Sequence, residues 1–108
     1  MRIISGSQRG RKLLGPRDAS VRPALDNIRE AVFNILSAEV ESARVLDLFC
    51  GVGAFGLEAL SRGARRTHFV DNSSGSLAIL GRNIELLGFD AFSSVEQGDA
   101  YGFPPADA

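Results

Sequence analysis

The sequence predicts an α/β fold in which helices flank a parallel β-sheet. Three short β-prone segments alternate with two amphipathic helical segments, the pattern of consecutive βαβ units with right-handed crossovers. A glycine-rich or acidic turn directly follows each of the three β-prone segments. Parallel sheets of this kind bind ligands beyond the carboxyl ends of their strands. A small β-hairpin and one further helix are expected ahead of the sheet.

Length and composition favour one small soluble domain. The chain has 108 residues, of which 44% are hydrophobic and 23% are charged. No apolar run approaches the roughly 20 residues of a membrane span, and the first residues do not lead into a signal peptide. A single cysteine, Cys50, excludes an intrachain disulfide framework, so a cytoplasmic location is the simplest expectation. We expect a monomer that contacts no membrane and binds no metal.

Charge is distributed unevenly along the chain. Residues 1–29 carry seven bases and two acids, whereas residues 30–108 carry five bases and eleven acids. A basic arm on an acidic body predicts that the arm meets a polyanion while the body has another task. We therefore divide the chain into an arm and linker, residues 1–23, and a domain, residues 24–108. The bases expected to contact phosphates are Arg9, Arg11, Lys12 and Arg22, although a solvated basic hairpin would show the same pattern.

The sequence pattern of the first half of the chain predicts a hairpin and a helix. Residues 2–5 and 9–14 are two short segments separated by a turn, which predicts the hairpin. A helix is expected over residues 24–38, with Arg29 on its exposed face. Apolar residues recur along this helix at the 3.6-residue spacing of a buried stripe: Leu25, Ile28, Val32, Ile35 and Leu36.

The second half contains the sheet and its helices. Strands are expected over residues 44–49, 66–70 and 92–96. A helix over residues 54–62 should stop at Gly63 in a left-handed conformation. The next helix should be capped by Ser73 or Ser74 and closed by Gly88, with an apolar stripe of Leu77, Leu80, Ile84 and Leu87.

A glycine-rich loop joins the first strand to the helix that follows it. Gly51, Gly53 and Gly56 lack the Cβ atoms that would obstruct a ligand, and the helix directs its first N–H groups at the loop. Asp71 follows Gly51 by 20 residues, where a ribose-binding acid is expected. A tight turn that binds nothing is the alternative. Asp71 and Asp99 both lie at strand ends that should meet the loop, so a ligand site is favoured.

Asp47 helps to identify the ligand. A carboxylate four residues before the first glycine would repel a pyrophosphate but suits a ligand with an amine or a sulfonium. S-adenosylmethionine (SAM) has both groups, together with ribose hydroxyls and an adenine amino group. Asp47 would serve the methionine end, Asp71 the ribose and Asp99 the adenine. Phe49 or Tyr101 could stack nearby, or could simply be core residues.

Several motifs resemble those of one known family. Residues 45–53 resemble the first motif of class I SAM-dependent methyltransferases, and residues 69–72 and 98–100 look like their ribose and adenine motifs. Residues 1–6, 9–13, 22–23 and 29–36 are similar to the opening of the bacterial 16S rRNA guanine-N2 methyltransferases. The resemblance implies a Rossmann-like class I methyltransferase fold. It also implies that SAM is held by Asp47, Phe49, Gly51, Gly53, Asp71, Asn72, Asp99 and Ala100.

The same resemblance implies a reaction. A guanine of 16S rRNA, free or within the small ribosomal subunit, would receive a methyl group on its exocyclic N2 by direct displacement at the sulfonium. In this family the motif Asn/Asp-Pro-Pro-Tyr/Phe, after a fourth strand, holds the flipped base. Residues 103–106 read Phe-Pro-Pro-Ala and lack both the polar residue and the final aromatic. We therefore expect a truncated, N-terminal cofactor-binding portion with no catalytic residue and no turnover.

Two other functions remain open. A non-catalytic module that binds RNA, with or without SAM, would also fit a chain that lacks the base-holding motif. An NAD(P)-dependent oxidoreductase could use the same glycine loop, but Asp47 and the sequence Gly98-Asp99-Ala100 argue against it.

Overall fold

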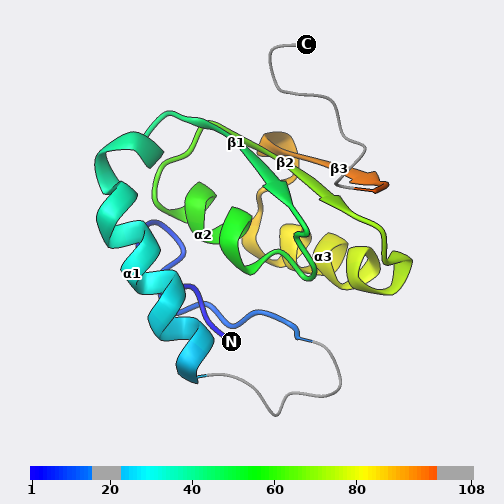
Figure 1. The fold of residues 1–108 in the computed structure, drawn as a ribbon, viewed down its shortest axis with the longest axis horizontal. Helices are drawn as coiled ribbons and strands as arrows, with labels where there is room; N and C mark the ends of the chain where they lie inside the picture. The colour runs from blue at the N-terminus through cyan, green and yellow to red at the C-terminus, as the bar shows by residue number, and fades with distance from the viewer. Residues whose placement is uncertain (16–22, 100–108) are drawn as a thin grey trace.

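The structure is a computed structural model that describes residues 1–15 and 23–99, with the backbone alone for residues 23–26. Its elements alternate as the sequence predicts (Figure 1). They are α1 (Pro23–Val40), β1 (Arg44–Leu48), α2 (Ala54–Ser61), β2 (Arg66–Asp71), α3 (Ser74–Leu87), the 3₁₀ turn η1 (Asp90–Phe92) and β3 (Ser93–Gln97).

The three strands form a parallel sheet in the order β1-β2-β3. Asp47 of β1 pairs with Phe69 of β2, which pairs with Val95 of β3. Helices α2 and α3 lie on the same side of the sheet, and α1 lies beyond α2 (Figure 1). Two βαβ crossovers in one direction produce this arrangement, so the predicted Rossmann-like fold class is confirmed.

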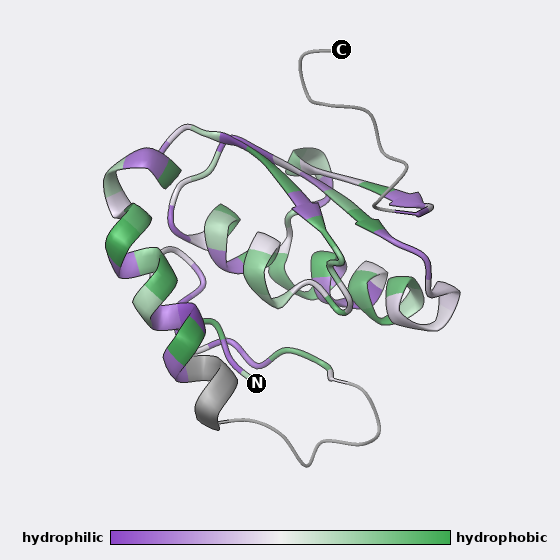
Figure 2. Cartoon of the chain, viewed as in Figure 1, coloured by the Kyte–Doolittle hydropathy of each residue, from purple (hydrophilic) through white to green (hydrophobic). Residues whose placement is uncertain are grey.

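The hydrophobic core lies between the sheet and the two crossover helices. Leu57 of α2, Phe69 of β2 and Leu80 of α3 are completely buried, and Figure 2 shows hydrophobic residues along both helices beneath the sheet. Ile3 and Leu13 belong to the same cluster. The basic N-terminal segment is therefore fastened to the domain by its own apolar residues, which alternate with exposed basic ones.

The N-terminal hairpin is shorter than predicted. Arg2 and Lys12 form an isolated antiparallel bridge, and Ile3 donates its N–H to the Arg11 carbonyl at 2.9 Å. No regular strand forms in residues 1–15, because the next N–H groups, those of Ile4 and Ser5, turn away from the hairpin and bind a side chain of α2.

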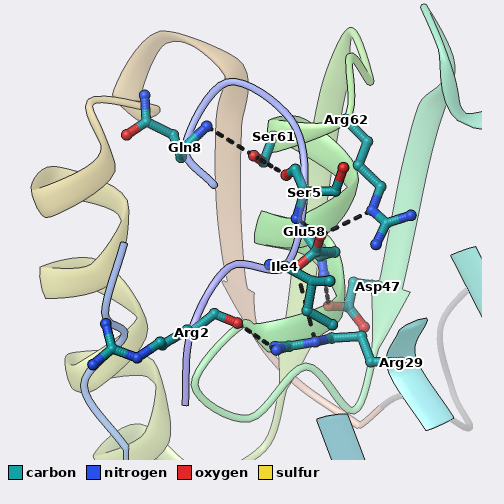
Figure 3. Close-up of polar contacts among 10 residues, drawn as sticks. Arg2, Ile4, Ser5, Gln8, Arg29, Asp47, Glu58, Ser61 and Arg62 are labelled. Carbon is teal, nitrogen blue, oxygen red and sulfur yellow. Dashed lines mark hydrogen bonds and ion pairs between the residues drawn. The ribbon is translucent and has the colours of Figure 1, made fainter. Parts of the chain in front are cut away.

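That side chain is Glu58, which is fully buried. It lies among Ile4, Ser5 and Arg62 (Figure 3). It accepts N–H groups from Ile4 at 2.8 Å, Ser5 at 3.0 Å and the Arg62 Nε at 2.8 Å. The Arg29 Nε lies 3.8 Å from it, and the Arg29 Nη2 donates to the Arg2 carbonyl. A buried charge is tolerated only when paired and hydrogen-bonded, and here the pairing joins the N-terminal segment, α1 and α2.

The buried face of α1 differs from the prediction. Arg29, expected in solvent, is 2% exposed, whereas Ile28 and Ile35, expected in the core, are 53% and 80% exposed. The helix turns Arg29 toward Glu58, and one turn later Phe33 packs against Phe55 and under the Arg62 guanidinium, 4.9 Å from the ring centre. An ion pair therefore sets which face of α1 is buried.

The glycine and serine residues at the helix ends predicted most of those ends correctly. Gly63 adopts the predicted left-handed conformation, with a φ of +105°. Gly88 closes α3 as predicted, with a φ of +72°, and the Ser73 hydroxyl caps the helix by accepting the Ser76 N–H. β3 begins one residue later than predicted because Phe92 completes η1. Among the described residues, no helix is long and apolar enough to cross a membrane.

Glu58→Gln tests the buried ion pair. The amide would direct an N–H at the N–H of Ser5 or Arg62, so we expect the free energy of unfolding to fall by about 3–5 kcal/mol, or the cooperative transition to vanish. Urea denaturation followed by circular dichroism measures this loss. The matched substitution Glu85→Gln, at an exposed position of α3, should cost less than about 0.5 kcal/mol. Equal effects of the two substitutions would contradict the assigned role of Glu58.

Candidate functional site

The glycine loop reverses the chain between β1 and α2. Phe49, directly after β1, has a φ of +58°, which is unusual for a bulky residue, and its side chain is 60% exposed. The Cys50 N–H donates to the Val70 carbonyl at 3.0 Å, which continues the β1–β2 pairing for one more residue. Gly53 then closes a turn onto the Cys50 carbonyl at 2.9 Å and begins α2 with a φ of +97°.

The three glycines of the loop have different surroundings. A Cβ on Gly53 would lie 2.4 Å from the Leu80 Cδ1, and one on Gly56 would lie 2.3 Å from the Phe69 Cε1. These two glycines allow α2 to pack against α3 and the sheet. A Cβ on Gly51 would meet nothing within 4 Å, so Gly51 is the glycine of the three that a ligand can approach.

Asp71, at the end of β2, holds the loop in place. One carboxylate oxygen accepts the Gly51 N–H at 2.8 Å, and the other accepts the Ser73 N–H at 2.9 Å. The Asp71 carbonyl accepts the Gly98 N–H at 3.0 Å, which brings the end of β3 alongside. The predicted site residues Asn72 and Asp99 are exposed at these two strand ends, whereas Ala100 and Tyr101 lie outside the described residues.

Asp47 places a second carboxylate beneath the same loop. It accepts the Gly56 N–H at 3.0 Å. Burial raises the pKa of Asp47 to about 6, the Gly56 hydrogen bond opposes this shift, and the negative charge of Asp71 adds to it. A cationic group beside Asp47 would relieve both the burial cost and the repulsion. The two carboxylates therefore fit a sulfonium or ammonium ligand better than a pyrophosphate.

An apolar groove of about 450 Å³ adjoins the loop on the open edge of β1. Asp47 contributes a carboxylate to its lining, which is otherwise apolar at the side-chain level. The aliphatic and aromatic side chains come from three elements and the loop, and include Val32, Phe33, Leu36, Leu46, Phe49 and Phe55.

The surroundings of Cys50 disfavour its thiolate at neutral pH. Its side chain is buried, and burial, followed by the charges of Asp47 and Asp71, raises the pKa of the thiol to about 12. The thiolate is the reactive form of cysteine. Cys50 therefore serves as a small packed residue beside the loop. The described residues also contain no group of three or more metal-ligating side chains that could hold a metal ion.

The basic segment presents three of its four predicted phosphate contacts on the surface. Arg9, Arg11 and Lys12 are exposed, whereas Arg22 lies outside the described residues. Arg11 is also fixed to α3, since its Nη2 donates to the Leu86 carbonyl at 2.7 Å.

Sequence reasoning missed Asn83, which connects the basic segment to the loop. It is completely buried on α3 and hydrogen-bonds both Leu14 and Val52. The available signal was an amide within the predicted apolar stripe of this helix, directly before Ile84.

Comparison with known proteins finds one matching family model and several similar proteins. A family model described as Conserved hypothetical protein 95 matches residues 1–105. The chain is 38% identical over 100 residues to "Putative rRNA methyltransferase YlbH" of Bacillus subtilis, covering 93% of this chain and 54% of that protein. It is 41% identical over 87 residues to Ribosomal RNA small subunit methyltransferase D of Escherichia coli K12, covering 81% and 44%. The chain thus spans about half the length of these relatives.

Solved structures show the same fold. A structure described as "Putative methyltransferase yhhF from Escherichia coli" matches with a TM-score of 0.83 and 38% identity, over 93% of this chain and 54% of that one. A hypothetical protein from a Thermus species matches with a TM-score of 0.77 and 33% identity, over 92% and 56%.

Alanine substitutions separate packing glycines from unconstrained ones. Gly56→Ala should destabilise the protein by about 1–3 kcal/mol, because its Cβ would overlap the ring of Phe69. Gly81→Ala, in the middle of α3 with nothing within 4 Å of the new Cβ, should stabilise it by up to about 1 kcal/mol. Thermal melts of both variants measure the difference. The same sign for both would contradict the packing described for α2.

Asp47→Asn tests the buried carboxylate through pH. The folded-state pKa of Asp47, about 6, lies above its ordinary value of 3.8, so its stabilising contribution is present below about pH 4 and lost as pH rises through about 6. Without ligand, the variant should be more stable than the parent by on the order of 1–3 kcal/mol at about pH 7.5, and equal to it near pH 4. Urea titrations at both pH values measure this difference, and a less stable variant at about pH 7.5 would refute it.

Proposed function

This chain belongs to the family described as Conserved hypothetical protein 95, and we propose that it is the cofactor-binding part of an rRNA methyltransferase. One observation carries the proposal: the carboxylates of Asp47 and Asp71 converge on the backbone of a single glycine loop at the carboxyl end of the sheet. Relatives that are 38% and 41% identical, and that carry rRNA methyltransferase names, support it.

SAM is the proposed ligand of this loop. When bound, it supplies a methyl group on a sulfonium for transfer to a nucleophile. Asp71 would accept the ribose hydroxyls, since each of its oxygens accepts one backbone N–H and retains a further lone pair. The open backbone at Gly51, beside Gly53, would let the methionine end approach Asp47. Asn72, Asp99 and Ala100 would border the adenine, and Phe49 would lie at the entrance.

We further propose that the methyl acceptor is the exocyclic N2 of a guanine in 16S rRNA, free or within the small ribosomal subunit. Arg9, Arg11, Lys12 and Arg22 would bind its phosphates and add affinity rather than sequence selectivity. In this proposal, residues 1–23 form the arm that binds RNA, and residues 24–108 form the domain that binds the cofactor. The arm would reach the cofactor domain in a fixed position, since Ile3 and Leu13 lie in the core.

The 108-residue chain itself is proposed to bind without transferring a methyl group. Transfer to a guanine N2 requires groups that accept hydrogen bonds from the amino group and direct its lone pair at the methyl. No stretch of the sequence matches the Asn/Asp-Pro-Pro-Tyr/Phe motif that does this in the family it resembles. The second candidate, a non-catalytic RNA- and SAM-binding module, describes this same behaviour and is favoured by the same missing motif.

Titration calorimetry tests the cofactor. The full chain should bind S-adenosylhomocysteine but not NAD, because the two carboxylates oppose a pyrophosphate. Asp71→Asn should weaken binding by at least about tenfold, since it removes a charged hydrogen-bond acceptor. The matched substitution Asp90→Asn, in η1, should leave binding unchanged. Binding of NAD without binding of S-adenosylhomocysteine would overturn the proposal in favour of the oxidoreductase.

Incubation with unmodified 30S subunits and labelled SAM tests the activity. We expect no incorporation above background for this chain and incorporation for the Escherichia coli relative as a positive control. Incorporation by the 108-residue chain would show that it contains groups able to orient the base.

A further inference from the structure

The side-chain amide of Asn83 makes a two-point contact with the basic segment. Its Oδ1 accepts the Leu14 N–H at 2.7 Å, and its Nδ2 donates to the Leu14 carbonyl at 3.0 Å. Because the amide is planar, these two bonds fix the orientation of the whole group. Leu14 and Asn83 are 69 residues apart in the sequence, so this contact defines where the segment lies against α3.

The same amide reaches the glycine loop. The Nδ2 also donates to the Val52 carbonyl at 3.0 Å, between Gly51 and Gly53. Since Asn83 has two N–H donors and Leu14 takes one of them, the contact with Leu14 directs the second at Val52. Asn83 is completely buried, so losing either partner would leave a buried polar group unsatisfied.

Helix α3 supports both sides of this connection. One turn beyond Asn83, the Leu86 carbonyl accepts the Arg11 guanidinium at 2.7 Å. One turn before it, Leu80 packs so closely on Gly53 that an added Cβ would lie 2.4 Å away. A displacement of the basic segment from α3 would therefore release the Asn83 amide and weaken its hydrogen bond to Val52, whereas the Leu80 contact with Gly53 would remain.

We propose that Asn83 is a positioning residue that couples polyanion binding by the basic segment to cofactor binding by the glycine loop. Each ligand raises the affinity for the other, because each favours the arrangement in which the Asn83 amide contacts both Leu14 and Val52. This inference rests on the proposed function, which assigns the polyanion to the segment and SAM to the loop.

The test is the affinity for S-adenosylhomocysteine with and without a saturating oligouridylate of about 20 nucleotides, long enough to span the basic segment. In the parent chain, the oligouridylate should raise this affinity by about fivefold or more. In Asn83→Leu, both ligands should bind with no effect on each other. The matched substitution Asn34→Leu, at an exposed position of α1, should retain the full coupling. The readout is the ratio of the S-adenosylhomocysteine affinities measured with and without oligouridylate. A purely structural defect would weaken the binding of each ligand but would leave this ratio unchanged.

Leu14→Pro provides a second variant if Asn83→Leu does not fold. It removes the N–H that Asn83 accepts while leaving Asn83 in place, and it should abolish the coupling in the same way. An unchanged ratio in either folded variant, or no effect of oligouridylate on the parent chain, would overturn the inference while the proposed function stands. Failure of the parent chain to bind S-adenosylhomocysteine at all would overturn the proposed function itself.

Discussion

The buried carboxylate of Glu58 is the interaction on which the arrangement of this protein depends. A charge removed from water without partners would unfold a domain of this size, and here the partners come from the chain segments that most need to be placed. The N–H groups of Ile4 and Ser5 fix the N-terminal segment, and Arg62, the C-cap residue of α2, donates its Nε–H to the same carboxylate. Arg29 brings α1 to the same point.

The geometry of the loop follows from the same helix. The first turn of α2 offers the Gly56 N–H to Asp47, while its second turn offers Glu58 to the N-terminal segment. One short helix therefore contacts the two regions assigned to the cofactor and to RNA. The segment is held at Glu58 near its start, and further along it contacts α3, where Leu14 meets Asn83. The Glu58 carboxylate and the Asn83 amide are thus two successive attachment points of the N-terminal segment.

Features encoded locally could be predicted from the sequence. The alternation of strands and helices, the left-handed conformation of Gly63 and the Ser73 cap depend on residues close to one another, and they matched the structure. The face of α1 could not be predicted, because a pattern of hydrophobic residues counts Arg29 as a solvent-facing charge. Its partner lies 29 positions away, and nothing in the helix reveals it. The hairpin was overestimated for the same reason, since Glu58 competes for the N–H groups that would have extended it.

In the candidate site, too, some features follow from local sequence patterns and others depend on contacts between distant segments. Gly51, Asp47 and Asp71 were recognisable because a strand, a turn and an acid at a strand end form a short-range pattern. The different surroundings of Gly51 and Gly56 depend on which side chains pack behind each glycine, and those come from β2 and α3. Asn83 was visible as an amide among apolar residues, but its two partners lie in separate segments and only the folded chain brings them together.

The contact between Ile4 and Glu58 spans 54 residues, and this has a consequence for the order in which the protein folds during synthesis. The N-terminal segment leaves the ribosome before α2, so its binding partner has not yet been made when it emerges. At about 5–20 residues per second, roughly 3–10 s pass before α2 can receive it. During that time the apolar side chains of Ile3 and Leu13 have no core to enter. Although this segment is synthesised before the sheet and α2, it can reach its native position only after α2 has been made.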